Sequence, residues 1–177
     1  FSVASAETNP RSSDAHTINL SGKFSFSYPD GWILVPTNIA KEKYTEAFGE
    51  NARSKVSLAL QLDQGSEWLT FPYIFLMQST TYTGDVWSKL KAEFKGESCG
   101  ELKCIVDEER HILSQSVEMN GIFITHVFFV GNDLVTEMFL STDDQDRDAQ
   151  TFNNIIKSFS YDSQHVYNSN APRTKMI

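Results

Sequence analysis

The polar residues best placed to do chemistry lie in three consecutive predicted strands. Asn120-Gly121 is typical of a two-residue hairpin turn, and Gly131-Asn132 is a weaker signal of the same kind. With two residues in each turn, Gln115 lies opposite His126, and His126 lies opposite Glu137, on one face of the sheet. An imidazole beside a carboxylate is either an internally satisfied polar pair or a binding or proton-transfer site. We expect His126 to contact Glu137, and both interpretations stay open.

The same register predicts what surrounds this polar row. Apolar rows should flank it on both sides, namely Val117–Ile124–Phe139 and Leu113–Phe128–Val135. A binding role requires an open cleft over His126, whereas a structural role requires a helix packed across it. The middle strand, residues 122–130, is apolar on both faces and should therefore lie inside the sheet.

Motifs of common enzymes are absent from the sequence. There is no Gly-x-Ser-x-Gly, no glycine-rich phosphate loop ending in Lys-Ser or Lys-Thr, and no His-Glu-x-x-His. The run Asp144, Asp146 and Asp148 imitates the alternating ligands of a calcium loop, but Ala149 and Ile155 replace its required Gly and Glu. We expect these carboxylates to cap the helix that follows them. The chain is predicted to be non-catalytic, without a metal or cofactor.

The two cysteines of the chain, Cys99 and Cys104, lie in a polar segment that contains a glycine. A zinc site requires about two more nearby ligands, and the four histidines are scattered. We predict a disulfide, which favours an oxidising compartment. Trp68 lies in a segment without periodicity, where it serves either an interface with a partner or the packing of its loop onto the sheet.

Charge and hydropathy exclude two classes of partner. The chain has 177 residues and a formal net charge of −8. Nucleic-acid affinity depends on clustered Lys and Arg, which the sequence lacks, so this partner is not expected. The most hydrophobic run, residues 121–130, is half the length of about 20 residues that a membrane-spanning helix needs, and no such helix is predicted.

The ends of the chain differ in composition from its middle. Residues 1–7 contain Ala-x-Ala before a polar segment, which is similar to the end of a secretory signal peptide with cleavage after Ala6; an ordinary disordered leader is the alternative. We predict a disordered leader at 1–15, a single domain at 16–161 and a flexible tail at 162–177. The protein is expected to be exported, either periplasmic or extracellular, or lumenal in a photosynthetic source.

Periodicity within residues 16–161 predicts strands alternating with helices. Pro29-Asp30-Gly31 should connect residues 24–28 and 32–35 in a hairpin. Further strands are expected at about 56–62, 73–78, 110–119, 122–130 and 133–141. Helices are expected at about 38–48 and 85–95, and a last helix that starts within 143–146 and runs to about 159. The prediction is an α+β fold, an α/β/α sandwich with a mainly antiparallel central sheet flanked by helices.

Two segments carry a resemblance to a known superfamily. Residues 22–32, GKFSFSYPDGW, resemble the opening of PsbP-like and DcrB-like proteins, and residues 152–159, FNNIIKSF, resemble their final helix. The resemblance implies the same sandwich and mostly non-enzymatic proteins: lumenal extrinsic subunits, bacterial envelope proteins and a branch that binds a small GTPase. Partners this diverse leave the function of this chain open.

Two hypotheses of function follow. The first is an exported accessory protein that docks on an envelope or lumenal partner through the sheet edge or the loops. The second is a small-ligand carrier or an enzyme that uses a cleft near His126 and Glu137, and it requires a pocket larger than about 300 Å³.

Overall fold

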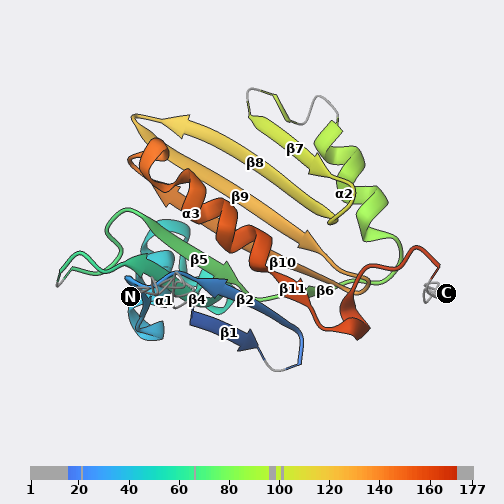
Figure 1. Cartoon of the computed structure of the whole chain (residues 1–177), viewed down its shortest axis with the longest axis horizontal. Coiled ribbons are helices and arrows are strands. Elements are labelled where there is room, and N and C mark those ends of the chain that lie inside the picture. Colours follow the sequence, from blue (N-terminus) through green and yellow to red (C-terminus); the bar gives the residue numbers. More distant parts are fainter. Residues whose placement is uncertain (1–15, 21, 66, 96–98, 101, 171–177) are drawn as a thin grey trace, which may run out of the picture.

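An eight-stranded antiparallel sheet forms the centre of the protein (Figure 1). The computed structural model describes residues 16–20, 22–65, 67–95, 99–100 and 102–170. The strand order is β3-β4-β5-β10-β9-β8-β7, and the short β6 (Thr80–Thr81) pairs with β10. The seven long strands are β3 (Trp32–Val35), β4 (Val56–Leu62), β5 (Tyr73–Met77), β7 (Lys103–Asp107), β8 (Ile112–Met119), β9 (Ile122–Val130) and β10 (Leu134–Thr142).

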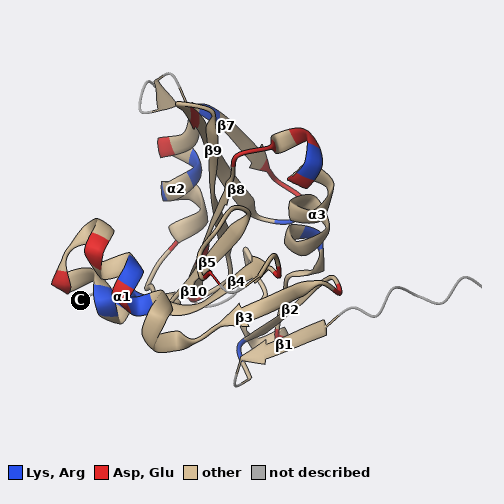
Figure 2. Ribbon diagram, turned by 90° about the vertical axis from the view of Figure 1, so that its left-hand side faces the viewer, with Lys and Arg blue, Asp and Glu red and all other residues tan. Residues whose placement is uncertain are grey.

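Helix α3 (Gln145–Ser158) and a small second sheet cover one face of the central sheet. The small sheet has the order β1-β2-β11 and consists of β1 (His16–Leu20), β2 (Phe24–Tyr28) and β11 (Ser160–Tyr161). Phe24 and Phe26 of β2 and Phe152 of α3 pack with the central strands in the largest apolar core. This layer lies on the opposite side of the sheet from the other two helices (Figure 2).

Helices α1 (Thr37–Phe48) and α2 (Val86–Lys95) cover the other face at separate places. Ala40 and Tyr44 of α1 pack on β4 and β5, while Trp87 and Phe94 of α2 pack on β8, β9 and β10. Two short 3-10 segments, η1 (Glu50–Lys55) and η3 (Ser163–His165), complete the described elements. The predicted α+β sandwich is confirmed, and Trp32 and Trp87 are buried.

The predicted hairpin at residues 24–35 is wrong. β2 pairs with β1 and β11, whereas β3 pairs with β4, so the turn at 29–31 carries the chain from one sheet to the other. Gly31 has a φ of 88°, and Trp32 N donates to Pro29 O at 3.3 Å. The turn prediction therefore held locally, but a local turn does not determine which strands pair on either side of it.

Part of the predicted flexible tail packs on the domain, which corrects the boundary at residue 161. Asn132 N donates to His165 O at 2.8 Å, and His165 Nδ1 lies 2.8 Å from Asp133 Oδ1. A Cβ on Gly131 would lie 2.5 Å from His165 O, so only glycine allows this approach. Tyr167 packs against His111, with ring centroids 4.2 Å apart. Residues 162–167 thus hold the turn between β9 and β10.

Candidate functional site

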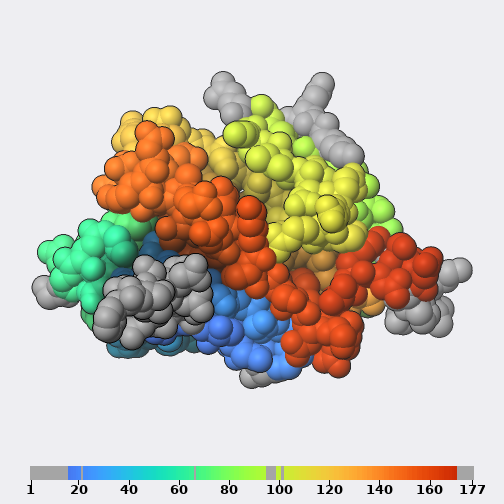
Figure 3. Space-filling view, in the orientation of Figure 1, coloured from blue at the N-terminus to red at the C-terminus, as the bar shows by residue number. Residues whose placement is uncertain are grey.

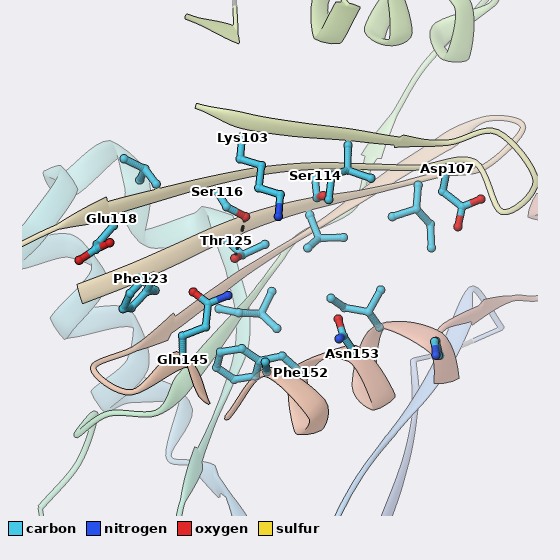
Figure 4. Close-up of a pocket in the computed structure, with 18 of the residues that line it drawn as sticks. Lys103, Asp107, Ser114, Ser116, Glu118, Phe123, Thr125, Gln145, Phe152 and Asn153 are labelled. Atoms are coloured by element: carbon cyan, nitrogen blue, oxygen red, sulfur yellow. Dashed lines mark hydrogen bonds between the residues drawn. The ribbon is translucent and has the colours of Figure 1, made fainter. Parts of the chain in front are cut away.

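A groove of about 840 Å³ lies between α3 and the outer strands β7, β8 and β9 (Figure 4). It forms because α3 contacts β2 and β10 and leaves the face of the outer strands partly uncovered. In the space-filling view, the orange surface of α3 separates the yellow surface of β8 and β9 from the blue surface of β1 and β2 (Figure 3).

The floor of the groove is apolar with one polar row. Alternation along β8 turns Ile112, Ser114 and Ser116 to the groove, because successive side chains of a strand point to opposite faces. On the neighbouring strand β9, Thr125 is paired with Ser116, and their hydroxyl oxygens lie 3.0 Å apart. The apolar part is contributed by buried side chains on both sides of the groove, namely Ile112, Val127, Leu140 and Phe152.

One cation points into this polar row. Lys103 is paired with Ser116 across β7 and β8, and its side chain extends into the groove toward the Ser116 and Thr125 hydroxyls (Figure 4). Among the described residues, no carboxylate forms an ion pair with Lys103. Asp107 also lines the groove, but its Oδ1 accepts hydrogen bonds from the Glu109 and Arg110 amides at 3.1 and 3.0 Å.

Arg110 connects the sheet to α3 at one end of the groove. Its guanidinium donates to the Lys157 carbonyl at 2.9 Å and to the Ile156 and Phe159 carbonyls at 3.4 Å. A cation at the C-terminus of a helix satisfies carbonyls that lack intrahelical partners and opposes the helix dipole. Arg110 is therefore engaged in the structure and links the sheet to α3 at this end of the groove.

The residues singled out from the sequence lie on the opposite face of the sheet. Gln115 is paired with His126 as predicted, but His126 is paired with Phe139, and Glu137 with Phe128. The predicted straight row of three is wrong because the turn after β9 is longer: Val130 pairs with Val135, not with Asp133. The predicted apolar rows on either side are wrong for the same reason: Ile124 pairs with Ser141 in place of Phe139.

The pairing of β9 with β10 differs from the prediction by two residues, and a shift of two leaves each side chain on the same face of the sheet. His126 and Glu137 are therefore still close enough for the predicted contact. His126 Nε2 lies 2.7 Å from Glu137 Oε1, diagonally across the two strands. The imidazole is flanked by Phe128 and Phe139, with both ring centroids 4.0 Å away. Neither His126 nor Glu137 lines the groove, so the predicted cleft near this pair is not the groove that the structure contains.

Helix α1 brings one more titratable group close to this pair. Burial raises the pKa of Tyr44, and the negative charge of Glu137 raises it further. Tyr44 is 7% exposed and packs edge-on against Phe75. The surroundings of His126 and Glu137 are therefore mainly aromatic side chains of the apolar core.

The cysteine prediction is confirmed. Cys99 and Cys104 form a disulfide with a Cα–Cα distance of 6.3 Å. The bond joins the segment that follows α2 to β7, and Cys104 packs against the core beneath α2. It thus anchors the strand that carries Lys103.

The acidic run is used by the helix, as predicted. Asp144 Oδ1 accepts a hydrogen bond from Arg147 N at 3.0 Å and caps α3. Asp148 is buried and accepts hydrogen bonds from Thr142 Oγ1 and from the Arg147 guanidinium. Burial opposes the charge on Asp148, but these hydrogen bonds outweigh it and lower its pKa. Within the described residues, no three His, Cys, Asp or Glu side chains cluster as metal ligands.

The loop that carries Trp68 is held by one buried amide. Gln61 is fully buried; its Nε2 donates to Glu67 O at 3.0 Å, and its Oε1 accepts from Leu69 N at 2.6 Å. Trp68 between these contacts is 39% exposed. Its role as an interface residue stays a prediction.

Sequence reasoning missed the residues of the groove, namely Lys103, Arg110, Ser114, Ser116 and Thr125. A signal was present in β8, where Ser114 and Ser116 put hydroxyls on a face that an interior strand usually buries. β7 was not predicted, so nothing placed Lys103 above that face.

No helix in the described part of the chain is long and apolar enough to cross a membrane.

Comparison with known proteins supports the fold and nothing finer. No family model matches the chain, and no curated protein matches it. The solution structure of cyanobacterial PsbP (CyanoP) from Synechocystis sp. PCC 6803 is similar, with a TM-score of 0.50 and 14% identity, covering 91% of this chain and 98% of that chain. At this identity the similarity shows a PsbP-like fold, and the resemblance to DcrB-like proteins stays a prediction.

Proposed function

We propose that the protein is a non-catalytic accessory protein that binds an extended segment of a partner protein along the outer edge of its sheet. The observation that carries the proposal is the position of β7. This strand ends the central sheet, and no described strand pairs with its outer edge. The same strand forms one wall of the groove through Lys103, Ile105 and Asp107.

These features suit strand addition by a partner. An unpaired edge offers backbone N–H and C=O groups to an incoming strand, and pockets beside the edge select its alternate side chains. Ile105 is 50% exposed at this edge, and its side chain lines the groove. A partner strand on β7 would cover Ile105 and place its inward side chains over the groove.

The composition of the groove favours binding over catalysis. The described residues of its lining include neither histidine nor cysteine, and the hydroxyls of Ser116 and Thr125 are hydrogen-bonded to each other. Activation of a hydroxyl nucleophile commonly uses a histidine or carboxylate that is hydrogen-bonded to it, and among the described lining residues neither hydroxyl has such a contact. The PsbP-like fold supports an accessory role by analogy.

The proposal includes export to an oxidising compartment: periplasmic, extracellular, or lumenal in a photosynthetic source. The disulfide between Cys99 and Cys104 supports it, as does the Ala-x-Ala sequence before Glu7. Fractionation of the source cells, with intact mass of the recovered protein, tests this part. Retention of residues 1–6 in a protein recovered from the cytoplasm would overturn it.

Site-specific photocrosslinking in the source cells tests the docking edge. A benzoylphenylalanine replaces Ile105 in the full chain, and the matched control carries it at Leu34, which is 49% exposed on β3 at the opposite edge. We expect one protein adduct from position 105 and none of comparable yield from position 34. Mass spectrometry identifies the partner, and Ile105→Asp should abolish its co-purification. Equal adducts from both positions, or none from position 105, would refute the proposal.

A small-ligand carrier is the second candidate, and the size of the groove favours it. Its volume of about 840 Å³ lies within the range of small-molecule sites, roughly 300–1,000 Å³. A carrier of this kind would use the groove under α3 and not the region of His126 and Glu137. Native mass spectrometry of protein purified from the source should then show a bound small molecule.

A further inference from the structure

We propose that Lys103, Ser116 and Thr125 form a subsite for a carboxylate, which an Asp or Glu side chain of the docking strand supplies. The inference rests on the proposed docking at β7 and specifies the chemistry of the partner. The three residues meet because β7, β8 and β9 are adjacent: Lys103 pairs with Ser116, and Ser116 pairs with Thr125. Figure 4 shows the Lys103 side chain directed toward the two hydroxyls.

The groups present are those that bind an oxyanion. An ammonium carries three donors, and each hydroxyl can rotate to donate. Ser116 Oγ and Thr125 Oγ1 lie 3.0 Å apart, so one hydrogen atom is shared between them and the other hydroxyl hydrogen is free to face the groove. A carboxylate placed between Lys103 and this pair would accept at least two hydrogen bonds, one of them from a charged donor.

The charges nearby select a single negative charge. Arg110 is engaged by carbonyls at the end of α3, and the groove lined by Lys103 also contains Lys157, Asp107 and Glu118. The chain as a whole carries a net charge of −8. Asp107 and Glu118 oppose a dianion such as phosphate, whose second charge the Lys103 ammonium does not neutralise. One ammonium neutralises one carboxylate.

The walls of the groove require apolar neighbours around that carboxylate. Val127 and Leu140 are almost fully buried beneath the groove, and Phe152 and Ile156 form its α3 side. Along an extended strand, residues i and i+2 face the same side, about 6 to 7 Å apart. The expected recognition sequence is therefore an acidic residue with apolar residues two positions away on either side.

Selection from peptide pools tests the subsite without knowledge of the partner. The probes are three pools of capped seven-residue peptides with Val, Leu, Thr or Ser at the outer positions and Glu, Gln or Lys at the centre. The full-length protein is immobilised, and retained peptides are quantified by mass spectrometry. We expect Glu-centred peptides to be enriched about tenfold over Gln-centred ones, the effect of one charged hydrogen bond.

Charge reversal supplies the decisive comparison. Lys103→Glu should remove the preference for Glu-centred peptides and favour Lys-centred ones, while Lys103→Gln should remove the preference alone. Lys89→Glu is the matched control, because it makes the same change of net charge at an exposed position of α2 on the other face of the sheet. An equal effect of Lys89→Glu would show that net charge is responsible and would overturn the subsite.

Two further outcomes also contradict the inference. Equal retention of Glu-centred and Gln-centred peptides by the unmodified protein would refute the carboxylate subsite. If crosslinking at position 105 were still observed in that case, partner docking at β7 would stand without the subsite. Octanoate that displaces the Glu-centred pool at concentrations below those of the peptides themselves would assign the groove to a free fatty acid. That result would overturn the assignment to a protein strand.

Discussion

His126 Nε2 lies 2.7 Å from Glu137 Oε1, although neither residue is the other's partner in the pairing of β9 and β10. Both side chains leave the same face of the sheet, and the diagonal between adjacent strands is short enough for long side chains to meet. Their side chains are 21% and 29% exposed, and aromatic rings flank the imidazole. These surroundings favour a structural hydrogen bond over a proton-transfer site.

A double-mutant cycle tests this structural role. We expect Glu137→Ala to lower the free energy of unfolding by about 1 to 2 kcal/mol, because His126 loses its partner. His126→Ala should cost at least as much, since it also removes the stacking on Phe139. The double variant should lose about 1 kcal/mol less than the sum of the two, measured by urea unfolding. Strict additivity of the two single variants would show that the contact between His126 and Glu137 contributes nothing to the free energy of unfolding. Glu118→Ala, on the opposite face of the sheet, serves as the control.

Arg110 should stabilise α3 through its carbonyl contacts. Arg110→Met retains most of the aliphatic part and removes the donors, so we expect a loss of about 1 to 2 kcal/mol in urea unfolding. Amide exchange should accelerate in the last turn of α3. The matched variant Arg53→Met removes only an exposed contact to Glu50 at 3.4 Å and should change stability by less than about 0.5 kcal/mol. Equal losses in the two variants would contradict the assignment.

Asp148 makes the stability of the protein depend on acid pH. Its pKa is lowered in the folded protein, so the folded state binds the proton more weakly than the unfolded chain, where an Asp has a pKa of about 3.9. The stabilisation is therefore complete above about pH 4 and is lost as the pH falls through the lowered pKa. Asp148→Asn should be less stable at neutral pH by about 1 to 3 kcal/mol.

The difference between the Asp148 variant and the unmodified protein should shrink as the pH falls below 4. Urea unfolding at several pH values measures it. Asp146→Asn in the same turn is the control, because Asp146 is exposed. A difference that stays constant down to the lowest pH, or grows there, would show that the charge on Asp148 is not the source of the stability.

The segment from Ser163 to Tyr167 should contribute to stability. A chain that ends at Asp162 loses the contacts of His165 with Asn132 and Asp133 and the packing of Tyr167 on His111. We expect a loss of about 2 kcal/mol, equivalent to a decrease of roughly 4 to 8 °C in the melting temperature. A chain that ends at Asn170 retains these contacts and is the comparison. Equal melting temperatures of the two chains would show that these contacts add no stability and that the domain ends at residue 161, as predicted from the sequence.

Local patterns in the sequence determined the elements whose causes are local. Asn120-Gly121 predicted the register of β8 on β9, because a two-residue turn leaves the strands one alignment. Asp144 predicted the start of α3, since the capping interaction spans three residues. The proximity of Cys99 and Cys104 in the chain predicted their bond.

Tertiary contacts decided what local patterns leave open. Periodicity shows which side chains share a face, but not which strand lies beside them, so β2 and β3 were wrongly joined in one sheet. The turn after β9 is longer than its Gly131-Asn132 sequence predicts, because it is held by His165 from the other end of the domain. The groove depends on where α3 crosses the sheet, and that position results from packing against β2 and β10, far apart in the sequence.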